Sequence, residues 1–254
     1  MATNSPSRSE RIAHLGAVAA LFMRDHVLSR VSHDLRSPLN AIHSWAYVLE
    51  RKIDATDAAA QRAIEGIRTG VEQQVQLLEK IVDTTRSETR RLQIDAKPFP
   101  ADATINDAID DARIALADAR GVTIDAHGMP CGATLNGDAE RCEQALWLML
   151  VFAVEASARG ATVMLGVSED NGQLRIAVDF VATAHALTDD TVPHRLEAFA
   201  RTQAREPQEG GQAAWVLALC QRVAEAHGGR FEAQPVADGA PVMLTLTLPV
   251  LATA

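Results

Sequence analysis

The 254-residue sequence is poor in aromatic residues and cysteine, and it has no excess of positive charge. Aromatic residues make up 4% of the chain, which favours helices packed through Leu, Ile, Val and Ala. At a net charge of −9, the chain lacks the surplus of Lys and Arg typical of nucleic-acid-binding proteins, so we expect no nucleic-acid partner. The cysteines Cys131, Cys142 and Cys220 are odd in number and fit no metal-binding spacing. We therefore expect core thiols in a reducing, cytoplasmic compartment, and no bound metal.

Long apolar runs are also missing, so we expect no membrane insertion. Residues 12–23 have the length of a signal peptide, but no small-residue cleavage site follows them and the helical pattern continues. We interpret them as the first turns of a long helix. The overall composition, 47% hydrophobic and 22% charged, is that of a globular protein.

Two long amphipathic helices are predicted in the first third of the chain, over residues 9–52 and 57–92, with Asp54 or Thr56 as the cap of the second. Apolar residues recur at intervals of three and four along each helix, which indicates one buried seam per helix. The seam residues are Leu28, Val31, Leu35, Leu39, Ile42, Ala46 and Leu49 in the first helix and Ile64, Ile67, Val71, Val75, Leu78 and Val82 in the second.

The short connection between these helices predicts an antiparallel hairpin. A single hairpin buries only one stripe per helix, so we expect two chains to pair into a four-helix bundle. The alternative is a monomer in which the second half of the chain covers the hairpin.

The segment "AKPFPAD" at 96–102 interrupts the helical pattern and marks a domain boundary. We assign residues 1–8 to a flexible N-terminus, 9–95 to the hairpin and 96–254 to an α/β sandwich with helices on one face of a mixed sheet. The expected helices are 101–119, 138–158 and 211–227. The expected strands are 121–126, "ATVMLGVS", "LRIAVDF", "RFEAQP" and "VMLTLTLP".

The stretch "SHDLRSPLN" at 32–40 places a histidine beside an acid and five residues before a proline. His33 lies two residues from the seam positions Val31 and Leu35, so it points toward water. Pro38 removes a backbone donor, and we expect it to kink the helix just below the histidine. An unprotonated imidazole is a good nucleophile at neutral pH. An exposed histidine on a rigid helix has the access that phosphoryl transfer needs.

This stretch, with "AI" after it, resembles the phosphoacceptor box of the two-component sensor histidine kinases. The resemblance covers about residues 10–250 and implies a fold of class α + α/β: a dimerising helical hairpin followed by a Bergerat-type α/β sandwich that binds ATP. It implies that His33 is the phosphoacceptor and that Asp34 orients the imidazole and takes its proton. Ser37 stands where the family often has a residue that positions a water for dephosphorylating the partner. The alternative for Ser37 is a hydroxyl that bonds its own helix. We expect the neighbouring Arg36, Pro38 and Asn40 to contact the partner.

The ATP site of the family is not matched. The segment "GDAERCEQALWLMLVFAVEASARG" at 137–160 is similar to the helix that carries the family's asparagine box, but Leu148 and Phe152 occupy the two asparagine positions. Leu cannot ligate Mg²⁺, which requires oxygen ligands, and Phe fills the space of the ion. Glu155 falls where the family often has a basic residue facing phosphate, so its charge has the wrong sign.

Both glycine boxes depart from the family as well. Asp179 is one residue early for the aspartate that reads adenine, and no glycine follows it, although an adenine-reading role stays open. Ala214 and Val216 stand where a Gly-x-Gly should bring backbone amides to a phosphate.

Four losses at chemically distinct contacts indicate a degenerate nucleotide site in a retained fold. We expect a histidine phosphotransferase of kinase-like fold, which moves a phosphoryl group through His33 between receiver-domain aspartates. Its partners would be response-regulator receiver domains, which bring their own Mg²⁺, and a second copy of the chain; it would need no cofactor and no ATP. The alternatives are a non-catalytic pseudokinase that regulates a kinase or a response regulator, and a sensor histidine kinase with an aberrant nucleotide site.

Overall fold

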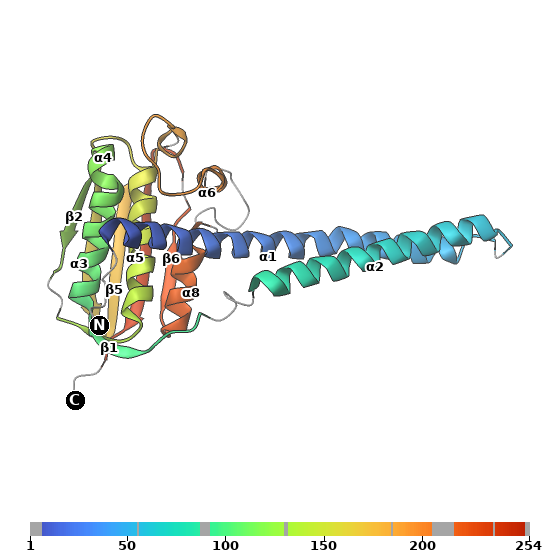
Figure 1. The fold of residues 1–254 in the computed structure, drawn as a ribbon, viewed down its shortest axis with the longest axis horizontal. Helices are drawn as coiled ribbons and strands as arrows, with labels where there is room; N and C mark the ends of the chain where they lie inside the picture. Colours follow the sequence, from blue (N-terminus) through green and yellow to red (C-terminus); the bar gives the residue numbers. More distant parts are fainter. Residues whose placement is uncertain are drawn as a thin grey trace. The chain divides into compact units, whose positions relative to one another are not determined.

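The computed structural model (Figure 1) describes residues 7–54, 56–86, 92–129, 132–183, 185–204, 216–235 and 237–251. The chain forms two compact units, one of residues 1–23 with 91–254 and the other of residues 24–90. Helix α1 (Arg8–Glu50) contributes to both units. Its first part therefore packs with the α/β unit, whereas the sequence analysis assigned residues 9–23 to the hairpin. No helix among the described residues is both long and apolar enough to cross a membrane.

The hairpin unit consists of the later part of α1 and helix α2 (Ala58–Arg86). Helix α1 continues through Pro38 without interruption. Helix α2 begins after Asp57, whose carboxylate accepts hydrogen bonds from the Ala59 and Ala60 amides at 3.1 and 3.0 Å. The cap is thus Asp57 and not the predicted Asp54 or Thr56, because the Asp54 carboxylate bonds Thr56 within the preceding turn.

Ion pairs across the hairpin show that the two helices run antiparallel. Arg36 pairs with Glu79 at 3.1 Å and Arg68 with Glu50 at 3.3 Å, so residues later in α1 meet residues earlier in α2. The predicted antiparallel hairpin is confirmed.

The α/β unit is built on a five-stranded sheet of order β2-β4-β5-β7-β6. Strand β2 (Thr123–His127) runs parallel to β4 (Thr162–Asp170), and all other neighbours are antiparallel. The remaining strands are β5 (Gln173–Val181), β6 (Arg230–Ala233) and β7 (Pro241–Pro249). The sheet is therefore mixed, as predicted.

A second, two-stranded sheet pairs β1 (Lys97–Pro100) with β3 (Thr134–Gly137). The segment "AKPFPAD", which the sequence predicts as a domain boundary, thus contains a strand, β1, that holds Pro98 and Pro100. A proline is tolerated in an edge strand, where its missing amide costs no ladder hydrogen bond.

Helices α3 (Ala101–Ala112), α5 (Ala139–Ala156) and α8 (Ala218–Ala226) cover one face of the large sheet (Figure 1). Helix α3 continues through a π-helical turn, η1 (Arg113–Ala117), into α4 (Asp118–Arg120). The short η2 (Ala186–Thr188) and α6 (Ala198–Gln203) follow β5. Helix α5 is buried on nearly all sides, because residues 8–23 of α1 cover the side that faces away from the sheet. The expected α/β sandwich with helices on one face is confirmed.

Candidate functional site

His33 lies on α1 with its side chain 85% exposed. Its Nδ1 atom is 3.5 Å from the Asp34 carboxylate, at the limit of a hydrogen bond. The other carboxylate oxygen of Asp34 is 3.5 Å from Nε of Arg30, one turn earlier on the helix. Because Asp34 faces Nδ1, Nε2 is the ring nitrogen left for an incoming electrophile. The site therefore combines an exposed histidine with an adjacent acid.

The residues after His33 are also on the surface of the hairpin. Arg36, Ser37, Pro38 and Asn40 are all exposed. Within the described part of the chain, the Ser37 hydroxyl makes no hydrogen bond, so it does not bond its own helix. Arg36 lies on the same helix as His33, and its guanidinium donates to the carboxylate of Glu79 on α2 at 3.1 Å.

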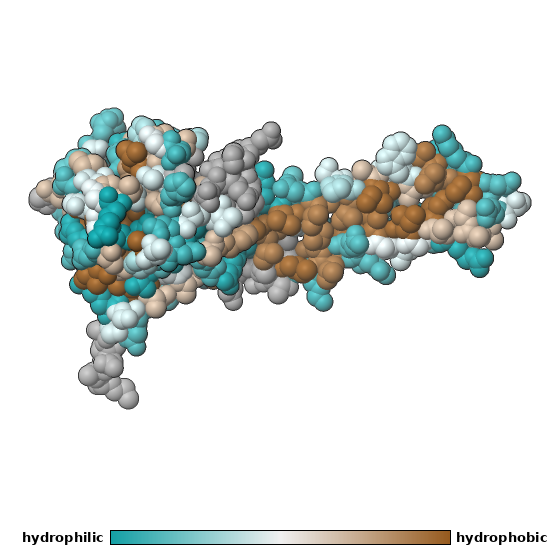
Figure 2. Space-filling view, turned by 90° about the horizontal axis from the view of Figure 1, so that it is seen from above, coloured by the Kyte–Doolittle hydropathy of each residue, from teal (hydrophilic) through white to brown (hydrophobic). Residues whose placement is uncertain are grey.

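The predicted seam is largely open to solvent in the single chain. In α1, Ala46 is buried, but five of the seven seam residues are 38–47% exposed: Leu28, Val31, Leu35, Ile42 and Leu49. In α2, Ile64 and Val71 are buried and Ile67 is 45% exposed, while the side chain of Val82 lies outside the described residues. Figure 2 shows these apolar residues as a brown stripe along the hairpin.

In the α/β unit, one face of α5 carries Leu148, Phe152 and Glu155, which the spacing of four and three residues places in one row. All three are fully buried. The Phe152 ring meets the Phe180 ring edge-on, with centroids 6.1 Å apart. Since Asp179 comes one residue early, Phe180 itself stands at the position of the family's adenine-reading aspartate. Two positions expected to be hydrophilic are thus filled by aromatic rings in contact.

Asp179 points to the opposite side of the sheet. Along β5, Ile176, Val178 and Phe180 are buried, whereas Asp179 is exposed. Successive side chains of a strand alternate between faces. The structure therefore does not bring Asp179 together with Leu148 and Phe152.

Glu155 holds the segment that follows β5. Its carboxylate accepts hydrogen bonds from the backbone amides of Arg195 and Leu196 at 2.5 and 2.9 Å. The other carboxylate oxygen lies 2.7 Å from Nδ1 of His194. Glu155 thus binds the chain's own backbone. In the family, the same position often carries a basic residue that faces phosphate.

Arg120 also binds the segment that follows β5. Its guanidinium donates to the carbonyl oxygens of Pro193, Glu155 and Ala186, each at 3.0 Å. Burial lowers the pKa of Arg120, and the negative charges of Glu155 and Asp189 oppose that shift. The unexpected charge of Glu155 is visible in the sequence, whereas Arg120 and His194 are not predicted as its neighbours, because no local pattern marks residues 35 and 39 positions away as partners.

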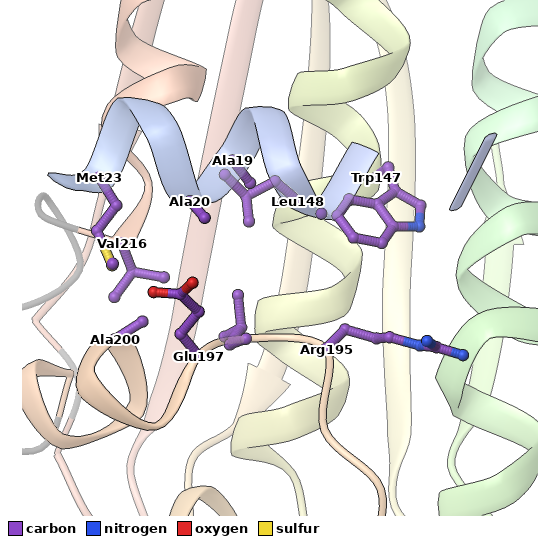
Figure 3. A pocket seen from close by; sticks show the side chains of 11 residues that line it. Ala19, Ala20, Met23, Trp147, Leu148, Arg195, Glu197, Ala200 and Val216 are labelled. Carbon is purple, nitrogen blue, oxygen red and sulfur yellow. The ribbon is translucent and has the colours of Figure 1, made fainter. Parts of the chain in front are cut away.

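A small cavity lies beside Leu148 in the α/β unit (Figure 3). Leu148 and Val216 line it together with Ala200 of α6, and residues of α1 close it. Val216 is buried, and Ala214 lies outside the described residues. Arg195 and Glu197 are the charged residues among those that line it. No oxygen ligand for Mg²⁺ comes from Leu148 or Phe152.

Comparisons with known proteins agree with this architecture. The family model described as the His Kinase A (phospho-acceptor) domain matches residues 23–90. A crystal structure of a histidine kinase from Burkholderia phymatum STM815 is similar over 96% of this chain and 99% of that chain, with 47% sequence identity and a TM-score of 0.76.

Two curated relatives are more distant. The sensor protein ChvG of Agrobacterium fabrum is 26% identical, and the match covers 88% of this chain and 38% of ChvG. The signal transduction histidine-protein kinase BaeS of Escherichia coli is 24% identical over 90% of this chain and 47% of BaeS. The chain thus spans less than half the length of these curated relatives.

Proposed function

Because the chain belongs to the two-component sensor histidine kinase family, we propose that it carries a phosphoryl group on His33 between receiver-domain aspartates without using ATP. Its family places the chain in two-component signalling. The proposal adds that the phosphoryl donor is a receiver domain and not ATP. The observation that carries it is the contact between Phe152 and Phe180, which fills two positions that a nucleotide and its metal would need.

The transfer follows from the geometry at His33. The Nε2 lone pair forms a bond to phosphorus as the bond between phosphorus and the receiver's aspartate oxygen breaks, and the aspartate leaves as a carboxylate. Asp34 accepts the hydrogen bond from Nδ1 and stabilises the positive charge that develops on the ring. The reverse steps hand the phosphoryl group to a second receiver. The Mg²⁺ that neutralises the phosphoryl oxygens would come with the receiver's own acidic pocket.

A dimer of the chain would cover the apolar seam and still leave His33 accessible to a receiver domain. An apolar stripe of this length is unusual on the surface of a monomeric protein and marks an interaction site. Pairing two hairpins would bury the stripe and leave His33 outside it, since His33 does not belong to the seam. Arg36, Ser37, Pro38 and Asn40 would then flank the histidine on the surface that a receiver approaches.

A second candidate is an ordinary autokinase, which is favoured by the description of the Burkholderia phymatum protein as a histidine kinase. Such an enzyme would require Mg-ATP to enter a region where Leu148, Phe152 and Glu155 have no exposed surface. The two candidates differ in the phosphoryl donor, so one experiment separates them.

The experiment offers the chain two labelled donors in parallel: a receiver domain phosphorylated on its aspartate, and Mg-ATP labelled on the γ-phosphate. We expect label to pass from the phospho-receiver to the native chain and not to the His33→Gln variant, with no label taken from ATP. Label from ATP alone would establish the autokinase. No label from either donor would favour a non-catalytic regulator.

A further inference from the structure

Residues 8–23 of α1 pack on the α/β unit through one apolar stripe. Five of them are buried: Ile12, Leu15, Ala19, Phe22 and Met23. Ala13 and Ala17, on the other side of the helix, are exposed. A Cβ added at Gly16 would lie 3.9 Å from the Trp147 ring of α5, an ordinary van der Waals distance, so this part of α1 is in packing contact with α5. The small side chains of this segment let the helix lie directly on α5.

Charged contacts anchor the start of the same segment. Nε of Arg8 and Nε of Arg11 lie 2.8 and 2.9 Å from the two carboxylate oxygens of Asp111, whose side chain is 1% exposed. Arg11 also contacts the carboxylate of Glu143 on α5. A buried carboxylate without a cation would cost several kcal/mol, so Asp111 requires these arginines. The segment is therefore held at one end by charge and along its length by apolar burial.

The apolar end of the segment borders the small cavity beside Leu148. Gly16, Ala19, Ala20 and Met23 line the small cavity together with Leu148 and Val216. Figure 3 shows Ala19, Ala20 and Met23 above Val216 and Ala200. On the other side, Glu155 fixes the loop at Arg195 and Leu196.

We propose that residues 8–23 are an intramolecular ligand of the α/β unit: a helix in a groove that takes the place of nucleotide and keeps this face closed without ATP. The idea rests on the proposed loss of nucleotide binding. The stabilisation that a free nucleotide gives a protein grows with the logarithm of one plus the ratio of its concentration to its dissociation constant. A covalently attached segment is present at an effective concentration of about millimolar or above. The closed face is thus independent of the nucleotide pool.

The proposal is tested by placing a carboxylate on either side of the segment in the full chain. Ala19→Glu puts the charge into the buried stripe, and Ala17→Glu makes the same change on the exposed side of the same helix. Hydrogen–deuterium exchange, measured without nucleotide, reports on residues 8–23 and on α5. We expect exchange at least about tenfold faster in both regions for Ala19→Glu, a change equivalent to about 1.4 kcal/mol. We expect native rates for Ala17→Glu.

Equal rates in the two variants would overturn the proposal. If Ala19→Glu does not fold, Arg11→Gln gives a milder test, because it weakens the charged anchor and leaves the apolar stripe intact. It should raise exchange in residues 8–23, and native exchange there would also count against the proposal. Since no nucleotide is present, these results do not depend on whether the chain binds ATP. Mg-ATP binding to the native chain would instead overturn the proposed function.

Discussion

Nδ1 of His194 lies 2.7 Å from the Glu155 carboxylate, and Nε2 of the same ring lies 3.1 Å from the carbonyl oxygen of Asp189. Both partners are hydrogen-bond acceptors. The Nδ1 contact joins the segment after β5 to α5, and the Nε2 contact is made within that segment. Glu155 is fully buried and His194 nearly so. In the sensor kinase family this helix position often faces phosphate, whereas here it binds the protein itself.

Removing the charge of Glu155 should destabilise the α/β unit. Glu155→Gln retains one oxygen for the two backbone amides but turns an amide group toward His194. We expect a loss of about 1–3 kcal/mol in the free energy of unfolding, the usual cost of a buried polar group that loses its partner. Denaturant unfolding measures the loss. Glu169→Gln, at an exposed position of β4, serves as the control and should unfold like the native chain.

The native chain should show no binding of Mg-ATP in a calorimetric titration. The reason is steric and chemical: Leu148 and Phe152 are buried and carry no oxygen, and the Phe152 ring is packed against Phe180. A dissociation constant in the micromolar range, which corresponds to about −8 kcal/mol, would contradict this and favour the autokinase.

Replacing His33 should abolish phosphoryl acceptance without changing stability, because its side chain is 85% exposed. His43→Gln, a second histidine of α1, is the matched control and should accept phosphate normally. Asp34→Asn should slow transfer strongly, since a neutral amide cannot stabilise the positive charge on the ring. Labelling by a phospho-receiver measures all three variants. Full labelling of His33→Gln would exclude His33 as the acceptor.

A charge in the seam should dissociate the expected dimer. Ile42 is 46% exposed in the single chain and would be covered by the second hairpin. We expect Ile42→Glu to weaken association at least about tenfold, because a buried unpaired carboxylate costs more than 1.4 kcal/mol. Ser44→Glu, at an exposed position nearby on α1, should leave the dimer intact. Sedimentation at tens of micromolar distinguishes the variants, and a native chain that is already monomeric would refute the prediction.

The thiols of Cys142 and Cys220 should be unreactive in the folded protein. Burial raises the pKa of Cys142 to about 12 and raises that of Cys220 as well. At pH 8 the thiolate fraction of Cys142 is therefore on the order of one in ten thousand. In a Cys131→Ser background, which removes the cysteine outside the described residues, a thiol reagent should label nothing until denaturant is added. Rapid labelling of the folded chain would show that α5, which carries Cys142, or α8, which carries Cys220, opens readily.

Local patterns in the sequence predict the two hairpin helices and the strands of the large sheet, and they place His33 on the surface of the hairpin. The seam spacing predicts both hairpin helices and places His33 outside the stripe, and the structure has α1, α2 and an exposed His33. Alternation along β5 likewise predicts a strand. These features depend on residues only a few positions apart, whose faces the helical and strand periods determine.

Other features depend on contacts between distant residues, and only the tertiary structure decided them. Residues 8–23 pack with the α/β unit because Arg8 and Arg11 meet Asp111, about a hundred positions later. Asp179 faces away from α5 because the register of β5 assigns that face to Phe180. Glu155 binds the backbone at 195 and 196, which no helical pattern can indicate. The spacing of apolar residues along a helix or strand shows which of its sides is buried. It does not show which other helix or strand will cover that side.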